Sequence, residues 1–161
     1  MNENYIKEKE IANMPKSIPL QIMEILVPKL KKQICKIKLN DGGHGTGFFC
    51  NISYDYNSIL KVMITNNHVL NKNDLSIGKK INFSINNDKI DYEIEIDELR
   101  RIYTNEQYDI TIIEIKQNDK LDQISFFDID NQIFDDNFKE IYKNMQIYLL
   151  HYPKGSQMEY S

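Results

Sequence analysis

The sequence has no tryptophan and only two cysteines, Cys35 and Cys50, in its 161 residues. Two cysteines cannot form the disulfide framework that small secreted domains need. No apolar stretch is long enough to cross a bilayer, and residues 1–10 are polar and charged, without the apolar centre of a secretory signal. We therefore expect a cytoplasmic protein with reduced thiols and no membrane partner.

An excess of basic residues is also lacking. Asp and Glu number 24 against 20 Lys and Arg, which gives a net charge of −4. Nucleic-acid binding needs a concentrated basic surface, so the composition argues against that partner. The three histidines follow no known zinc-ligand spacing and no cysteine pair supports them, so neither a metal nor another cofactor is expected; these histidines are His44, His68 and His151.

The glycine-rich segment 42–47 superficially resembles a phosphate-binding loop. It leads into an expected strand rather than a helix, and no lysine follows its last glycine. We interpret it as a tight turn entering a strand.

The N-terminal region, residues 1–32, is predicted to be a loose polar arm followed by an amphipathic helix. Ser17 is a suitable helix cap, with Ile18 and Pro19 in the first turn. Apolar residues then recur at helical spacing over residues 20–30. Pro28 is expected to interrupt or kink this helix, which is expected to lie on the surface of a neighbouring body.

Six short strands follow, separated by polar turns, and they predict an all-β fold. The turn signals include residues 40–43 and 86–88. Regular short strands are typical of an antiparallel sandwich or a small barrel, in which closure removes exposed edges. We assign residues 33–116 to a first β-barrel with strands at 33–39, 45–52, 58–64, 80–85, 90–96 and 108–115.

The remaining residues are predicted to leave this barrel. Residues 117–144 are acidic and less periodic, which indicates a connection with some helical character near residues 136–142. A new strand is predicted at 145–152, followed by the turn signal Pro-Lys-Gly at 153–155. Because a lone strand cannot bury its faces, residues 145–161 are interpreted as the start of a second, incomplete barrel.

The candidate chemistry centres on His68 and Asp109. His68 follows the apolar run 59–64, which is predicted to be a buried strand, and Asp109 lies 41 residues later at the end of another expected strand. A carboxylate that accepts from one imidazole nitrogen fixes the tautomer and stabilises the imidazolium formed when the other nitrogen takes a proton. The alternative is a hydrogen-bonded loop histidine and an aspartate that serves only its turn.

Four motifs occur in a fixed order along the chain, and together they resemble the chymotrypsin/trypsin-like serine peptidases. The closest likeness is to the trypsin-like peptidase domains without disulfides, over roughly residues 33–161. The resemblance implies that His68 is the general base, that Asp109 is its orienting carboxylate, and that the substrate is a polypeptide. In secreted members a disulfide lies beside the histidine, but His44 and Val69 stand at those positions here. The motifs are GTGFF at 45–49, TNNHVL at 65–70, YDITII at 108–113 and IYLLHYPKG at 147–155.

The nucleophile of that family is missing from the sequence. In the family's template the serine follows the aspartate by about 90 residues, whereas only 52 residues follow Asp109 and no G-x-S-G-G motif occurs. None of the three candidate serines has the flanking glycines that shape an oxyanion hole from backbone N–H groups. Cys50, within a predicted strand, and Cys35 are interpreted as small buried hydrophobic residues. The serines considered are Ser125, Ser156 and Ser161.

We therefore expect a trypsin-like serine endopeptidase domain that is truncated before its nucleophile and inactive as written. One alternative is a non-catalytic, peptidase-like binding module, in which a partner chain completes the second barrel by pairing with its exposed edge. Another is an unrelated β-barrel binding protein in which the motifs occur by accident.

Overall fold

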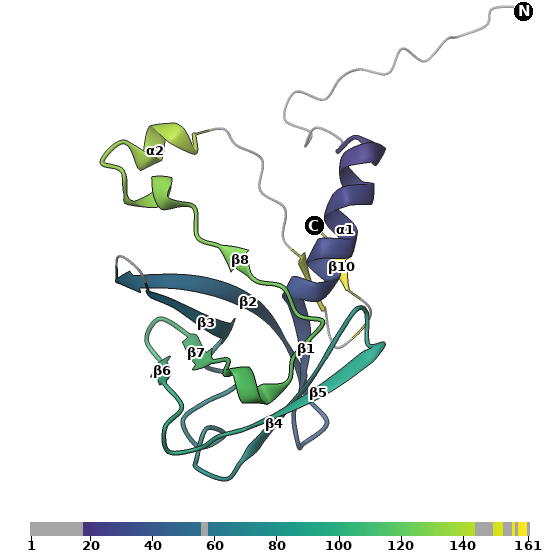
Figure 1. Cartoon of the computed structure of the whole chain (residues 1–161), viewed down its shortest axis with the longest axis vertical. Helices are drawn as coiled ribbons and strands as arrows, with labels where there is room; N and C mark the ends of the chain where they lie inside the picture. The colour runs from purple at the N-terminus through teal and green to yellow at the C-terminus, as the bar shows by residue number, and fades with distance from the viewer. Residues whose placement is uncertain (1–17, 56–57, 144–149, 153–155, 157, 161) are drawn as a thin grey trace, which may run out of the picture.

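The computed structural model describes residues 18–55, 58–143, 150–152, 156 and 158–160. Seven antiparallel strands and a short eighth strand, which pairs in parallel with the second, form one curled sheet, from which an N-terminal helix projects (Figure 1). The sheet order is β5-β4-β1-β2-β3-β7-β6. The strands are β1 Ile34–Lys38, β2 His44–Asp55, β3 Ser58–Thr65, β4 Lys80–Ile85, β5 Ile90–Glu95, β6 Ile102–Asn105 and β7 Ile110–Glu114. The predicted β-rich class is confirmed.

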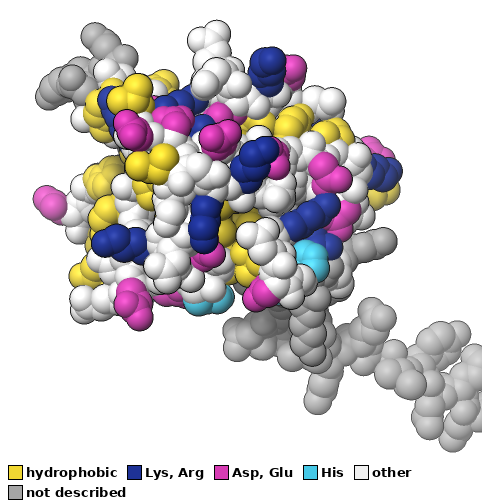
Figure 2. Space-filling model, turned by 90° about the horizontal axis from the view of Figure 1, so that it is seen from below, with side chains coloured by type: hydrophobic (Ala, Val, Ile, Leu, Met, Phe, Trp, Pro, Cys, Tyr) yellow, Lys and Arg dark blue, Asp and Glu magenta, His cyan; other side chains and the backbone are white. Residues whose placement is uncertain are grey.

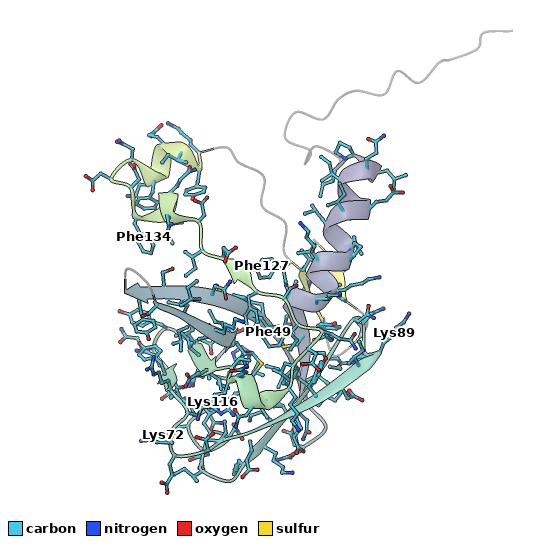
Figure 3. All side chains as sticks on the ribbon, in the orientation of Figure 1. Phe49, Lys72, Lys89, Lys116, Phe127 and Phe134 are labelled. Atoms are coloured by element: carbon cyan, nitrogen blue, oxygen red, sulfur yellow. The ribbon has the colours of Figure 1, made fainter. Side chains whose placement is uncertain are left out.

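The apolar core fills the inside of the curl. Phe49 of β2 lies centrally (Figure 3) and its ring packs 5.6 Å from that of Phe83 and 5.9 Å from that of Phe126, centroid to centroid. Burial alternates along β7, where Thr111 and Ile113 point inward. Aromatic pairs of this geometry add to the stability gained by removing apolar surface from water.

Cys35 and Cys50 are free and buried, as predicted. Burial raises the pKa of both thiols, so they remain protonated at neutral pH. Cys35 contributes to the core and contacts the Met63 sulfur, with its Sγ 3.7 Å from that Sδ. Neither cysteine has the properties of a reactive thiolate.

The two outer strands of the sheet, β5 and β6, are consecutive in the sequence. Residues 96–101 join them, and the Arg100 side chain lies between the ends of β5 and β7. Its guanidinium donates to the carbonyl oxygens of Glu95, at 3.0 Å, and Glu114, at 2.7 Å. It also forms a bidentate ion pair with the Asp119 carboxylate, with N···O distances of 2.8 and 2.7 Å. Only 2% of the Arg100 side chain and 5% of the Asp119 side chain are exposed.

The helix α1, Leu20–Gln33, differs from the prediction at both ends. Pro19 rather than Ser17 precedes its first residue, and no side chain caps it. Pro28 lies inside the helix without ending it. A proline removes one hydrogen bond, and on an exposed helix water can satisfy the carbonyl that this frees. The helix continues through Gln33, so β1 begins at Ile34, and none of the helical residues is buried.

The strand β6 was not predicted, and the predicted strand at 108–115 begins only at Ile110. The prediction of six strands was therefore one short of the seven antiparallel strands of the sheet. β6 has four residues and none of them is buried, so it lacks the apolar alternation that marks a strand in a sequence. Tyr108 and Asp109 belong to the turn between β6 and β7.

The turn at residues 86–88 is confirmed, and it connects distant parts of the chain. Asn86, Asn87 and Asp88 all have positive φ, at 53°, 59° and 63°. The Asn86 N–H donates to the carbonyl of Lys31 at the end of α1, at 2.8 Å. The Asp88 carboxylate accepts from the ammonium of the buried Lys36, at 2.8 Å.

Residues 117–143 cross from the sheet as a connection with little regular structure. It contains the 3₁₀ helices η1 Gln117–Asp119 and η2 Asn131–Phe134, the two-residue strand β8 Phe127–Asp128 and the helix α2 Phe138–Ile141. β8 pairs in parallel with β2. The predicted helical character near 136–142 is confirmed by α2.

The C-terminal residues that the structure describes form a small hairpin beside the main sheet. β9 Leu150–His151 pairs with β10 Glu159–Tyr160, and residues 145–149 of the predicted strand lie outside the described residues. The buried Tyr152 fixes this hairpin, since its N–H donates to Thr46 Oγ1 at 2.9 Å. Within the described residues, no helix is long and apolar enough to cross a membrane.

Replacing Arg100 by methionine tests how the ends of the sheet are joined. The change leaves Asp119 as a buried, unpaired charge and removes a donor from two carbonyls, so we expect a loss of about 3–5 kcal/mol in the free energy of unfolding. Urea denaturation measures it. Glu93→Gln, which breaks the exposed Lys80–Glu93 ion pair, is the control and should leave the midpoint almost unchanged. Equal midpoints for the two variants would contradict this role for Arg100.

Candidate functional site

His68 lies on a short turn that directly follows β3. The carbonyl of Asn66 accepts from the N–H groups of Val69, at 3.1 Å, and Leu70, at 3.2 Å, and so closes the turn. Val69 and Leu70 are buried in the core, whereas 71% of the His68 side chain is exposed. The turn is therefore anchored by its two apolar residues and presents the imidazole to solvent.

Gly45 allows this turn to pack closely on β2. A Cβ built at residue 45 would lie 2.2 Å from Cγ1 of Val69 and 2.6 Å from its Cγ2, which is closer than real side chains approach. The hydroxyl of Thr65 donates to the carbonyl of Thr46, at 2.8 Å, and ties the end of β3 to the same strand. Only glycine at 45 permits this approach of Val69, the residue after the histidine.

Asp109 lies on the turn between β6 and β7, in the left-handed region with φ of 49°. Aspartate tolerates this conformation better than most side chains. Strands β3 and β7 pair with Thr65 opposite Thr111. His68 lies three residues after Thr65, and Asp109 lies two residues before Thr111. The strand pairing therefore places His68 beside Asp109.

Both oxygens of the Asp109 carboxylate accept hydrogen bonds from His68. The backbone N–H of His68 donates to Oδ1 at 2.9 Å, and the Nδ1 of its ring lies 2.7 Å from Oδ2. A carboxylate acceptor places the proton of a neutral imidazole on Nδ1 and leaves the Nε2 lone pair free. The structure thus brings together the two residues that the sequence singled out.

The pKa of Asp109 is lowered, so its carboxylate is ionised at neutral pH. The largest cause is the hydrogen bond from the His68 backbone N–H; the imidazole and the Asn66 amide act in the same direction. Hydrogen bonds to the charged form of a carboxyl group favour that form.

Four further polar side chains surround the pair, and sequence reasoning did not find them. The Thr111 hydroxyl donates to the Leu70 carbonyl at 2.7 Å. Its Oγ1 also lies 3.0 Å from the Oγ1 of Thr104, and the Thr104 hydroxyl accepts from the Asn67 amide. The Asn66 amide contacts Asp109 itself. Two of these residues neighbour His68 in the sequence, but asparagine in a turn carries no specific signal.

Two hollows flank His68. One, of about 260 Å³, lies between the β1–β2 turn and the segment after the histidine; Asp41, Val69 and Lys80 contribute to its lining. The other is open and measures about 730 Å³, and Lys72 and Glu106 lie along it beside Asp109. Figure 3 shows Lys72 at the end of the molecule away from α1. Figure 2 shows acidic and basic side chains interspersed on one face of the molecule.

The other candidates from the sequence do not join this site. In the described part of the chain, no hydroxyl or thiol is hydrogen-bonded to the imidazole of His68, and no three metal-ligating side chains lie together. The Ser125 N–H is bonded to the Lys32 carbonyl, at 3.1 Å, and Cys50 is buried in β2. His44 is exposed on β2, Ser156 is exposed, and Ser161 lies outside the described residues.

No family model, no curated protein and no solved structure matches this chain.

Replacing Gly45 by alanine tests how the histidine turn is held. The added methyl group must displace Val69 or β2, so we expect a loss of about 1–3 kcal/mol in unfolding free energy, together with NMR shift changes at His68. Gly78→Ala is the control: its Cβ meets no atom within 4 Å, and φ there is 82°. That variant should show only backbone strain, and equal shift changes at His68 in both would contradict the packing argument.

Replacing Asp109 by asparagine tests whether its charge stabilises the fold. The folded-state pKa of Asp109 is depressed, so its contribution is present above the unfolded value, about 3.9, and is lost as pH falls through the folded value. The difference in unfolding free energy between the wild type and Asp109→Asn should be present at about pH 5 and shrink as the pH falls below about 4, where the carboxylate of the folded state takes up its proton. Urea titrations between pH 2.5 and 7 measure it. A difference of the same size at both ends of that range would show that the charge is not involved.

Proposed function

We propose that this chain is the first barrel of a chymotrypsin-like serine endopeptidase, with His68 as general base and Asp109 as its orienting carboxylate. The observation that carries the proposal is the pair of hydrogen bonds that the Asp109 carboxylate accepts from His68, one from the backbone N–H at 2.9 Å and one from the ring Nδ1 at 2.7 Å. An aspartate whose side chain only stabilises its own turn would not need to accept hydrogen bonds from both the backbone and the ring of His68.

The arrangement suits a base that works at neutral pH. The Nε2 of His68 takes the proton of an attacking hydroxyl and later returns it to the leaving amine. Asp109 stays ionised throughout and stabilises the imidazolium, which agrees with its lowered pKa. Most of the imidazole surface is exposed, so a nucleophile and a substrate can approach it.

The strand order also supports the proposal. Residues 96–101 join the two outer strands β5 and β6. If β5 and β6 are counted as the two halves of one bent strand, the seven antiparallel strands become six, and the same strand stands at both ends of the strand order. That is the connectivity expected of a six-stranded antiparallel barrel.

In this proposal the nucleophile is supplied by residues other than these 161. The sequence has no G-x-S-G-G motif, and among the described residues no hydroxyl is bonded to His68. The serine, its oxyanion hole and the pocket that selects the substrate belong, in this proposal, to a second barrel of which β9 and β10 are the opening strands. By itself the 161-residue chain should hydrolyse no peptide.

A second candidate function, a non-catalytic peptidase-like binding module, is favoured by one observation. The helix α1 has no buried residue, and four of its apolar side chains are exposed: Leu20, Ile22, Ile25 and Leu26. Exposed apolar side chains on a helix without buried residues are typical of a partner-binding element.

Labelling with a fluorophosphonate, which reacts with activated serines, separates the two candidates. The natural protein that carries these residues should be labelled and should cleave casein. His68→Ala should lower the rate by about 10⁶-fold, and Asp109→Asn by about 10⁴-fold. His44→Ala, which removes an exposed histidine from β2, is the matched control and should leave the rate unchanged.

A natural protein that is neither labelled nor proteolytic would overturn the peptidase proposal and favour the binding module. Turnover by the isolated 161-residue chain that is lost in His68→Ala would contradict the assignment of the nucleophile to a second barrel.

A further inference from the structure

Asn66 is the side chain that makes two hydrogen bonds to Asp109. Its Nδ2 lies 3.1 Å from the carboxylate Oδ2 and 3.2 Å from the main-chain carbonyl oxygen of the same residue. An amide NH₂ group carries two hydrogens, so it can donate one to each acceptor. The same side chain thus holds both the carboxylate and the backbone of residue 109.

This contact matters because little else fixes Asp109. Its side chain is 44% exposed, and its backbone lies in the left-handed region, which is less favourable for a residue other than glycine. The Asp109 N–H donates to the Glu106 carbonyl at 3.2 Å. An exposed carboxylate on a turn of this kind has other rotamers open to it, and most would break the hydrogen bond to the imidazole.

We propose that Asn66 is a positioning residue, which holds the carboxylate and the left-handed backbone of Asp109 in the one arrangement that meets both N–H groups of His68. Asn66 lies two residues before His68 on the same closed turn, so the amide, the imidazole and the backbone N–H move as one unit. The catalytic consequence rests on the proposed function. The structural consequence does not, since it concerns only residues of this chain.

Asn67 provides a matched control within the same turn. It has the same side chain and also bonds the histidine turn to the β6–β7 region, but its amide donates to the hydroxyl of Thr104 and not to Asp109. A general loosening of the two turns should follow from either change. A specific effect on the carboxylate should follow only from the change at Asn66.

The experiment compares Asn66→Ala with Asn67→Ala in the 161-residue chain by NMR. Asn66→Ala should accelerate hydrogen exchange at the His68 backbone amide by about tenfold, the effect of losing one charge-assisted hydrogen bond. It should also raise the pKa of Asp109, followed by the carboxyl carbon shift, because a donor to the charged form is lost. Asn67→Ala should change neither the exchange nor the titration.

The isosteric Asn66→Asp keeps the shape of the side chain, removes the donor and adds a like charge, so it should raise the pKa of Asp109 more than alanine does. Urea midpoints identify any variant that has lost its fold. Equal effects of Asn66→Ala and Asn67→Ala on exchange and on the Asp109 titration would overturn the proposal, as would an Asp109 titration that is unchanged in Asn66→Asp.

A second arm reports on catalysis in the natural protein. There Asn66→Ala should lower kcat about 10- to 100-fold with little change in KM, as expected for a misplaced catalytic pair. If the natural protein has no peptidase activity while the NMR effects are seen, the proposed function fails and the role of Asn66 stands. If activity is present and Asn66→Ala leaves kcat unchanged, the positioning role fails and the proposed function stands.

Discussion

The antiparallel pairing of β3 with β7 is the constraint on which the candidate site depends. Four backbone pairs, from Val62 opposite Glu114 to Thr65 opposite Thr111, fix the register of the two strands. A shift of one residue would turn every side chain of one strand to the other face. In the observed register, the turn after β3 and the turn before β7 face each other, and residues 41 positions apart in the sequence meet within hydrogen-bonding distance.

The buried side of the same pairing holds the exposed side in place. Thr111 is fully buried and donates to the carbonyl of Leu70. The inner face of β7 is therefore hydrogen-bonded to the last residue of the turn that carries His68. Val69 packs against the space left by Gly45. The imidazole can therefore be solvent-exposed without being loosely held, which is what a proton-accepting side chain at the edge of a rigid scaffold requires.

Much of this arrangement could be predicted from the sequence, because hydrophobic alternation and turn residues are local signals. All six strands predicted between residues 33 and 116 and the 86–88 turn match observed elements, and His68 and Asp109 followed from the motifs around them. β6 could not be found, since its residues alternate weakly and depend on β7 for pairing. The helix α1 runs through Pro28 and ends at Gln33, one residue beyond the predicted boundary. Asn66 depends on a contact across 43 residues, which no local pattern encodes.

Arg100 has a consequence for how this protein behaves among other chains. The ends of a curled sheet normally offer free carbonyl groups, and such groups can pair with a strand of another molecule and begin aggregation. Here the carbonyls of Glu95 and Glu114 already accept from one guanidinium, whose charge is neutralised by Asp119. A foreign strand would have to displace a buried ion pair before it could bond at either position. A single side chain thus occupies the carbonyl acceptors at the ends of β5 and β7.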